Sequence, residues 1–125
     1  MRSPRLAVLV LAASIAFVPG CGGPKPSPLM TVSGTVEVDG EPLKGGQIVF
    51  VPLDANLSPE AGTIKDGTFE CSSKMGPMRI EITATRKNPG GLRANYIPAR
   101  YNKESELTED VSASNHHWDF KLTEH

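Results

Sequence analysis

The sequence predicts an all-β domain, a two-sheet sandwich of seven strands, behind an amino-terminal export signal. After residue 30, apolar and polar residues alternate with the period of two that is typical of strands with one buried face. Clusters of Gly, Pro, Asn and Asp interrupt this alternation at short intervals, as turns do. No stretch after the signal has helical periodicity. Residues 31–125 are enough for one small domain and leave no room for a second.

The first two strands are predicted at residues 31–38 and 46–52, and an Asp-Gly turn at 39–40 follows the first. In the first strand three valines share one face: Val32, Val36 and Val38. Residues 46–52 form an unbroken β-branched and aromatic run. Such a run predicts a central strand that is buried on both faces.

Two hairpins and one long strand are predicted in the rest of the domain. Residues 63–65 and 68–71 flank Asp66-Gly67, a strong hairpin signal. Residues 76–85 form the long strand, and residues 107–113 are expected to pair with 118–122. The expected core consists of inward-facing residues of these strands: Val36, Val38, Val49, Phe50, Phe69, Ile80, Ile82, Val111, Trp118, Phe120 and Leu122.

The first 20 residues have the organisation of an export signal. Arg2 and Arg5 precede an apolar run of 13 residues, 6–18, whereas a membrane-spanning helix needs about 20. Gly20 then stands directly before Cys21, an arrangement that resembles the lipobox of bacterial lipoproteins. The alternative is an ordinary secretory signal followed by a chance cysteine.

Lipid attachment at Cys21 and removal of residues 1–20 are therefore expected. Residues 21–30 are rich in Pro and Gly and predict a tether between the lipid and the domain at 31–125. We expect an exported protein that is lipid-anchored to a bacterial membrane, with its domain facing the periplasm or the exterior.

Charge argues against nucleic-acid binding, and the cysteine content argues against an intramolecular disulfide. Residues 21–125 contain 11 Lys and Arg against 14 Asp and Glu, a formal charge of −3, and they lack the basic stripe of a nucleic-acid-binding protein. If Cys21 carries lipid, Cys71 has no partner for an intramolecular disulfide. We expect Cys71 to pack in the core as a small apolar residue.

Three stretches resemble the carboxypeptidase regulatory-like domain, a transthyretin-like Greek-key sandwich: 31–43 (TVSGTVEVDGEPL), 62–69 (GTIKDGTF) and 76–83 (GPMRIEIT). The ending, with IPARYNKESEL at 97–107 and WDFKL at 118–122, is similar to short lipoproteins of planctomycete-type bacteria that carry one such domain. The resemblance implies a fold and a location, and no reaction.

No catalytic, metal or cofactor site is predicted. His116 and His117 are adjacent, so on a strand they point to opposite faces and cannot bind one metal together. Some intradiol dioxygenases hold iron with two Tyr and two His on a similar sandwich, which makes Tyr96 and Tyr101 alternatives beside these histidines. Hydroxyisourate hydrolases share the fold but end in a Tyr-Arg-Gly-Ser type motif, unlike residues 121–125 here. An envelope enzyme, metal-dependent or hydrolytic, remains an alternative.

The stretch at 86–106 has no clear strand alternation, and loops of that length in small domains are commonly functional. Arg and Tyr are enriched at interaction surfaces. The candidate interaction surface comprises Arg93, Tyr96, Arg100, Tyr101 and Lys103. We expect a non-catalytic binding or structural module whose cations meet an envelope protein or an anionic polymer. A carbohydrate-binding module is the other alternative, with Trp118, Tyr96 and Tyr101 as its only candidate aromatics.

Overall fold

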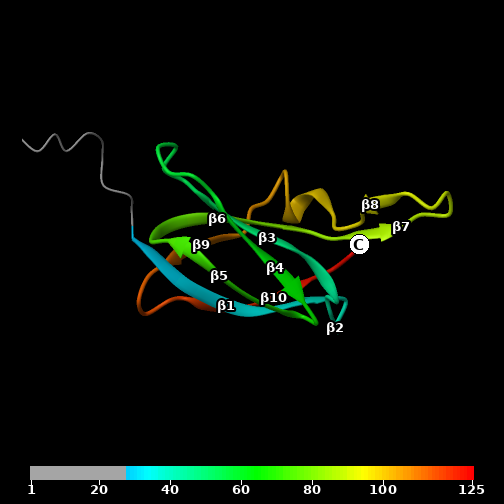
Figure 1. Ribbon diagram of the computed structural model, residues 1–125, viewed down its shortest axis with the longest axis horizontal. Coiled ribbons are helices and arrows are strands. Elements are labelled where there is room, and N and C mark those ends of the chain that lie inside the picture. The colour runs from blue at the N-terminus through cyan, green and yellow to red at the C-terminus, as the bar shows by residue number, and fades with distance from the viewer. Residues whose placement is uncertain (1–27) are drawn as a thin grey trace, which may run out of the picture.

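The computed structural model describes residues 28–125, and its regular secondary structure consists of β-strands except for one short 3-10 turn (Figure 1). The all-β prediction is confirmed. Expectations for residues 1–27, among them the signal and the lipidated Cys21, lie outside the described residues. The elements, in chain order, are β1 (Leu29–Val38), β2 (Glu41–Pro42), β3 (Gly45–Pro52), β4 (Glu60–Lys65), β5 (Thr68–Lys74), β6 (Gly76–Thr83), β7 (Thr85–Lys87), β8 (Arg93–Asn95), the 3-10 turn η1 (Ala99–Tyr101), β9 (Thr108–Val111) and β10 (His117–Leu122).

One curled sheet contains every strand except β7 and β8. Its order is β10-β1-β5-β4-β3-β6-β9, with the short β2 also paired to β1. All neighbours in it are antiparallel except β1 and β10, which run parallel. Phe50 on β3 and Trp118 on β10 have ring centroids 5.7 Å apart, although three strands separate β3 from β10 in the sheet. The sheet therefore curls around its apolar side chains.

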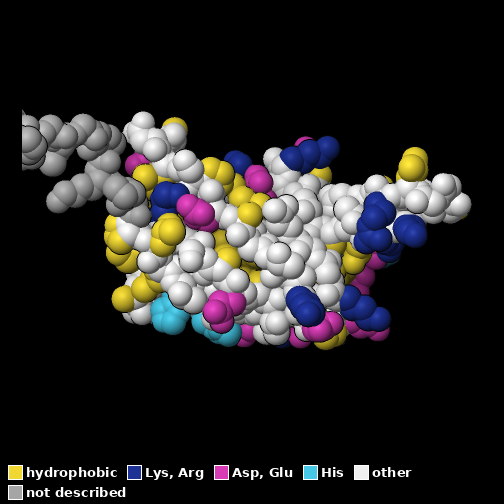
Figure 2. Space-filling model, in the orientation of Figure 1, with side chains coloured by type: hydrophobic (Ala, Val, Ile, Leu, Met, Phe, Trp, Pro, Cys, Tyr) yellow, Lys and Arg dark blue, Asp and Glu magenta, His cyan; other side chains and the backbone are white. Residues whose placement is uncertain are grey.

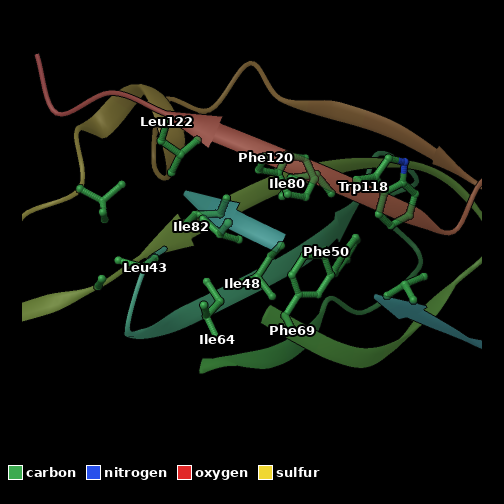
Figure 3. Packing of buried hydrophobic residues seen from close by; sticks show 14 of the residues in the cluster. Leu43, Ile48, Phe50, Ile64, Phe69, Ile80, Ile82, Trp118, Phe120 and Leu122 are labelled. Carbon is green, nitrogen blue, oxygen red and sulfur yellow. The ribbon is translucent and has the colours of Figure 1, made fainter. Parts of the chain in front are cut away.

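The core fills the inside of this curl (Figure 3). Four aromatic rings, those of Phe50, Phe69, Trp118 and Phe120, form a chain of contacts with centroids 5.7 to 6.4 Å apart. Isoleucines from β3, β4 and β6 complete the centre. The predicted inward positions on β6 and β10 are confirmed, because their buried residues alternate along both strands.

The prediction that residues 46–52 are buried on both faces is wrong. Along β3, Ile48, Phe50 and Pro52 are buried, while Val49 and Val51 are only half-buried. Within the described residues, no second layer covers the outer face of the curled sheet, so alternate residues of β3 remain partly exposed. Ile48, and not Val49, belongs to the core.

The predicted hairpin between residues 107–113 and 118–122 is also wrong. β9 pairs with β6, and β10 pairs with β1 at the opposite edge of the sheet order. A single bridge between Ser112 and Asn115 closes the turn that joins them. Seven strands were expected, and residues 28–125 contain ten, because the short strands β2, β7 and β8 are additional.

Both Asp-Gly pairs form tight turns. Asp66 and Gly67 have φ angles of 51° and 77°, and Asp39 and Gly40 have 51° and 82°. Two successive positive φ angles define the turn that matches the twist of a two-residue hairpin, and Gly adopts them at little cost. The predicted β4–β5 hairpin is thereby confirmed.

Candidate functional site

The residues after β6 form an ordered structure at one end of the sheet. β7 and β8 pair as a small hairpin that the sequence did not reveal, since all six of their residues are exposed. The side-chain oxygen of Asn88 accepts hydrogen bonds from the backbone N–H groups of Gly90 and Leu92, both at 3.0 Å. These bonds shape the hairpin turn.

After β8 the chain docks against the sheet over residues 96–105, here called the docked segment. Ile97 enters the core and is 3% exposed, while Tyr96 and Tyr101 pack against the core from its margin. The buried side-chain amide of Asn102 donates to the carbonyls of Ile82, Ile97 and Pro98 at 3.0 to 3.2 Å. These contacts hold the docked segment in a defined position on the domain.

Sequence reasoning missed two residues that fix the docked segment. Besides Asn102, the buried Ser105 hydroxyl donates to the carbonyl of Ile80. Both side chains satisfy carbonyls that the segment would otherwise bury without a donor. Asn and Ser are common in any loop, and only their burial, which the sequence does not display, distinguishes them.

The docked segment and the β7–β8 hairpin border a basic hollow of about 440 Å³. Its lining consists of Lys44, Gly45, Gly46, Thr85, Arg86, Arg93 and Tyr96. The guanidinium carbon of Arg86 lies 4.5 Å from the centre of the Tyr96 ring, a cation–π contact. Arg93 donates to the hydroxyl and to the carbonyl of Thr85 at 3.1 and 3.2 Å. The hollow therefore has three cationic side chains and no acidic one in its lining.

An adjoining hollow of about 300 Å³ shares Lys44, Arg86 and Tyr96 with the basic hollow but adds three acids. Of these, Glu124 forms an ion pair with Arg86 at 2.8 Å. The pair is largely exposed on the Arg86 side and contributes little stability. Arg86 thus stands between an acidic partner and the basic hollow, where an incoming anion can compete for it.

The other predicted interaction residues lie apart from the basic hollow. Arg100 donates to the carbonyls of Thr123 and His125 at 2.7 and 2.9 Å, so the chain's own last residues occupy it. Hydrogen bonding with Thr123 and the neighbouring Arg100 lower the pKa of the Tyr101 phenol, against a smaller opposing effect of desolvation. Lys103 is exposed. Of the predicted set, the structure therefore places only Arg93 and Tyr96 in the basic hollow, where Lys44 and Arg86 join them, while Arg100 and Tyr101 contact each other away from it.

The residues that an iron site or a carbohydrate-binding surface would need do not lie together. Tyr96 lines the basic hollow, whereas His116 lies beside Leu29 and Met75 at the other end of the sheet. Trp118 is 8% exposed and belongs to the core, as predicted, which leaves two aromatics for a carbohydrate surface. Among residues 28–125, no group of three or more His, Cys, Asp or Glu side chains is placed to hold a metal ion. Over the same residues, no helix has the length and apolar character needed to cross a membrane.

Cys71 is half-buried and packs against the core beside β4. Burial, with a smaller contribution from the negative charge of Glu60, raises the pKa of its thiol to about 11. The thiol is therefore protonated at neutral pH and is a poor nucleophile. This agrees with the predicted packing role.

Comparison of the chain with protein-family models, curated proteins and solved structures finds no match.

Proposed function

We propose that this protein is an exported lipoprotein, anchored through Cys21, whose domain binds an anionic polymer of the cell envelope without catalysis. The observation that carries the binding role is the basic hollow, where Lys44, Arg86 and Arg93 surround the Tyr96 ring with no acid in the lining. The anchoring role rests on the sequence around Cys21.

The chemistry of the basic hollow suits phosphate or carboxylate groups. Guanidinium groups bind such anions through paired hydrogen bonds, and Arg86 and Arg93 are each held by a contact that limits their freedom. Restricting a side chain in advance lowers the entropy that binding costs. The cations are exposed, so each contact is weak and sensitive to salt. A polymer with many repeats compensates for weak single contacts because several anchored domains can hold it together.

Binding of a linear polyphosphate to the full-length protein, followed by fluorescence polarisation, tests this function. We expect the double variant Lys44→Glu with Arg93→Glu to bind about tenfold more weakly or worse, since each reversed surface charge changes the binding free energy by about 1 kcal/mol. The matched double variant Lys103→Glu with Lys121→Glu makes the same change of charge at two exposed residues outside the lining, and it should bind much more tightly than the first double variant. Equal loss in both proteins would show a general charge effect and would contradict a site.

The anchor is tested in a bacterium that processes lipoproteins. Two acyl chains hold a protein firmly at a membrane, whereas one holds it only marginally. Cys21→Ala should therefore release the protein from the membrane fraction, and Cys71→Ala, the matched control at the other cysteine, should leave it there. Membrane association that persists in Cys21→Ala would contradict the lipoprotein assignment.

For the fold we propose a Greek-key sandwich of the transthyretin-like type, of the carboxypeptidase regulatory-like kind. The ring contact between Phe50 and Trp118 supports two layers, as does the short β4–β5 ladder, which has only two residue pairs before the strands separate. An experimental structure of the domain tests this, because two packed layers of strands are expected and a single open sheet would contradict it.

A further inference from the structure

The end of the sheet opposite the basic hollow carries exposed apolar side chains. Among residues 28–125, four large hydrophobic residues are largely exposed. Three of them, Leu29, Leu53 and Met75, lie at this end, with 56%, 58% and 47% of their surface accessible. Leu29 pairs with Lys74 in the β1–β5 ladder, which places it beside Met75. The backbone N–H of Leu53 donates to the carbonyl of Pro77 at 3.1 Å, which places the third residue near the start of β6. We call these three residues the apolar end.

The apolar end is also where the described chain begins. β1 starts at Leu29, and Figure 2 shows hydrophobic side chains gathered on that side, while Lys and Arg side chains gather over β7 and β8 at the other side. A shallow hollow of about 370 Å³ joins Leu29 and Met75 to Pro28, Met30, Thr31 and His116. Neither Asp, Glu, Lys nor Arg lines it.

We propose that the apolar end rests on the surface of the lipid bilayer to which Cys21 is anchored. This inference depends on the proposed lipidation. Seven residues lead from Cys21 to Pro28, and a fully extended chain of that length spans at most about 25 Å. The anchored cysteine therefore keeps the apolar end within reach of the headgroups, where apolar side chains can leave water.

The size of the apolar end favours a bilayer over a second copy of the chain. A stable protein–protein interface takes about 800 Å² from each partner, more than three partly exposed side chains and a shallow hollow provide. A domain that a lipid already holds at the surface needs only a small contact, because its effective concentration there is high. Among the described residues, Lys74 pairs with Leu29 in the β1–β5 ladder, and its ammonium group forms an ion pair with Glu60 at 2.7 Å. The contact is therefore apolar, and it does not depend on anionic lipids.

The test compares one position at each end of the lipidated full-length protein. Met75→Cys and Leu92→Cys are each made with Cys71→Ala and labelled with an environment-sensitive fluorophore. Leu92 is the matched control, since it is 71% exposed and lies in the β7–β8 hairpin turn. Mass spectrometry first establishes that Cys21 carries lipid. Aqueous iodide then quenches each probe on vesicles of phosphatidylcholine, with and without phosphatidylglycerol.

On both kinds of vesicle we expect severalfold weaker quenching at position 75 than at position 92, with a blue-shifted emission at position 75 alone. Adding Leu29→Ser and Leu53→Ser should remove the difference. Equal quenching at the two positions in lipidated protein would overturn this inference and leave the anchor intact. Absence of lipid on Cys21 would overturn both this inference and the proposed anchor. Protection at position 75 in a Cys21→Ala protein without vesicles, increasing with protein concentration, would assign the apolar end to a second copy instead.

Discussion

Asn102 shows how one buried amide can hold a segment of ten residues. Its side-chain nitrogen donates to three backbone carbonyls, those of Ile82, Ile97 and Pro98, and its oxygen accepts from the backbone N–H of Lys103 at 3.0 Å. Each buried carbonyl left without a donor costs about 1 to 3 kcal/mol. The docked segment therefore depends strongly on the side chain of Asn102, which does not line the basic hollow.

Asn102→Asp should make stability depend on pH. The new carboxyl group would face the same three carbonyls in a buried position, so its pKa in the folded protein should lie above the unfolded value of about 3.9. A folded pKa that is raised means that stability falls as pH rises above about 4. Urea unfolding at pH 4 and pH 7 measures this. Asn102→Ala loses its hydrogen bonds at both pH values, so an equal pH dependence in the two variants would contradict the explanation.

Cys71 should be nearly inert in the folded protein. Raising the pKa of its thiol from 9.0 to about 11 lowers the thiolate fraction at pH 8 by about 100-fold, and the thiolate is the reactive species. In a Cys21→Ala background, labelling by iodoacetamide at pH 8 should be slower by about that factor than in the urea-unfolded chain. Equal rates in the two states would contradict the burial of the thiol.

Alternation in the sequence identified the buried faces of the strands but not which strands pair with each other. The inward residues of β6 and β10 were predicted because a period of two reads directly as one buried face. The partner of β10 was predicted wrongly. His117 pairs with Ser33, 84 positions earlier, whereas a hairpin with the preceding strand was expected. β7 and β8 escaped notice because fully exposed strands carry no burial pattern.

The parallel pairing of β1 with β10 requires a glycine at position 34. Gly34 lies opposite Trp118, and a Cβ atom at Gly34 would stand 1.9 Å from the Trp118 carbonyl oxygen. That oxygen belongs to the backbone, so the two strands would have to separate. Gly34→Ala should therefore lower the melting temperature strongly and expose Trp118 to solvent.

The control for this variant is Gly45→Ala, in the first residue of β3. A Cβ atom there meets nothing within 4 Å, so the substitution should leave the melting temperature unchanged or raise it slightly, by reducing the entropy of the unfolded chain. Similar losses in both variants would mean that Gly34 is not special and that the close contact between β1 and β10 is not as described.

The basic hollow combines residues from separate segments of the chain, which no short sequence motif links. Arg93 and Tyr96 were predicted from their own segment, but Lys44 comes from the chain before β3 and Arg86 from β7. The antiparallel pairing of β3 with β6 places the start of β3 beside the end of β6 and so brings these segments to one end of the sheet, with the apolar end at the other (Figures 1 and 2). Such a distribution follows from strand order, which the sequence did not predict.

This separation of the two ends predicts that the proposed lipid anchoring and the proposed polymer binding do not compete. With the apolar end on a bilayer, the basic hollow faces away from the headgroups at the far end of the sheet. Lipidated protein on phosphatidylcholine vesicles should therefore bind linear polyphosphate with the same dissociation constant and salt dependence as soluble Cys21→Ala protein, because uncharged vesicles neither cover nor screen the cations. Co-flotation of labelled polyphosphate with the vesicles measures this. Binding that the vesicles abolish would place the basic hollow against the bilayer, with the domain in the opposite orientation.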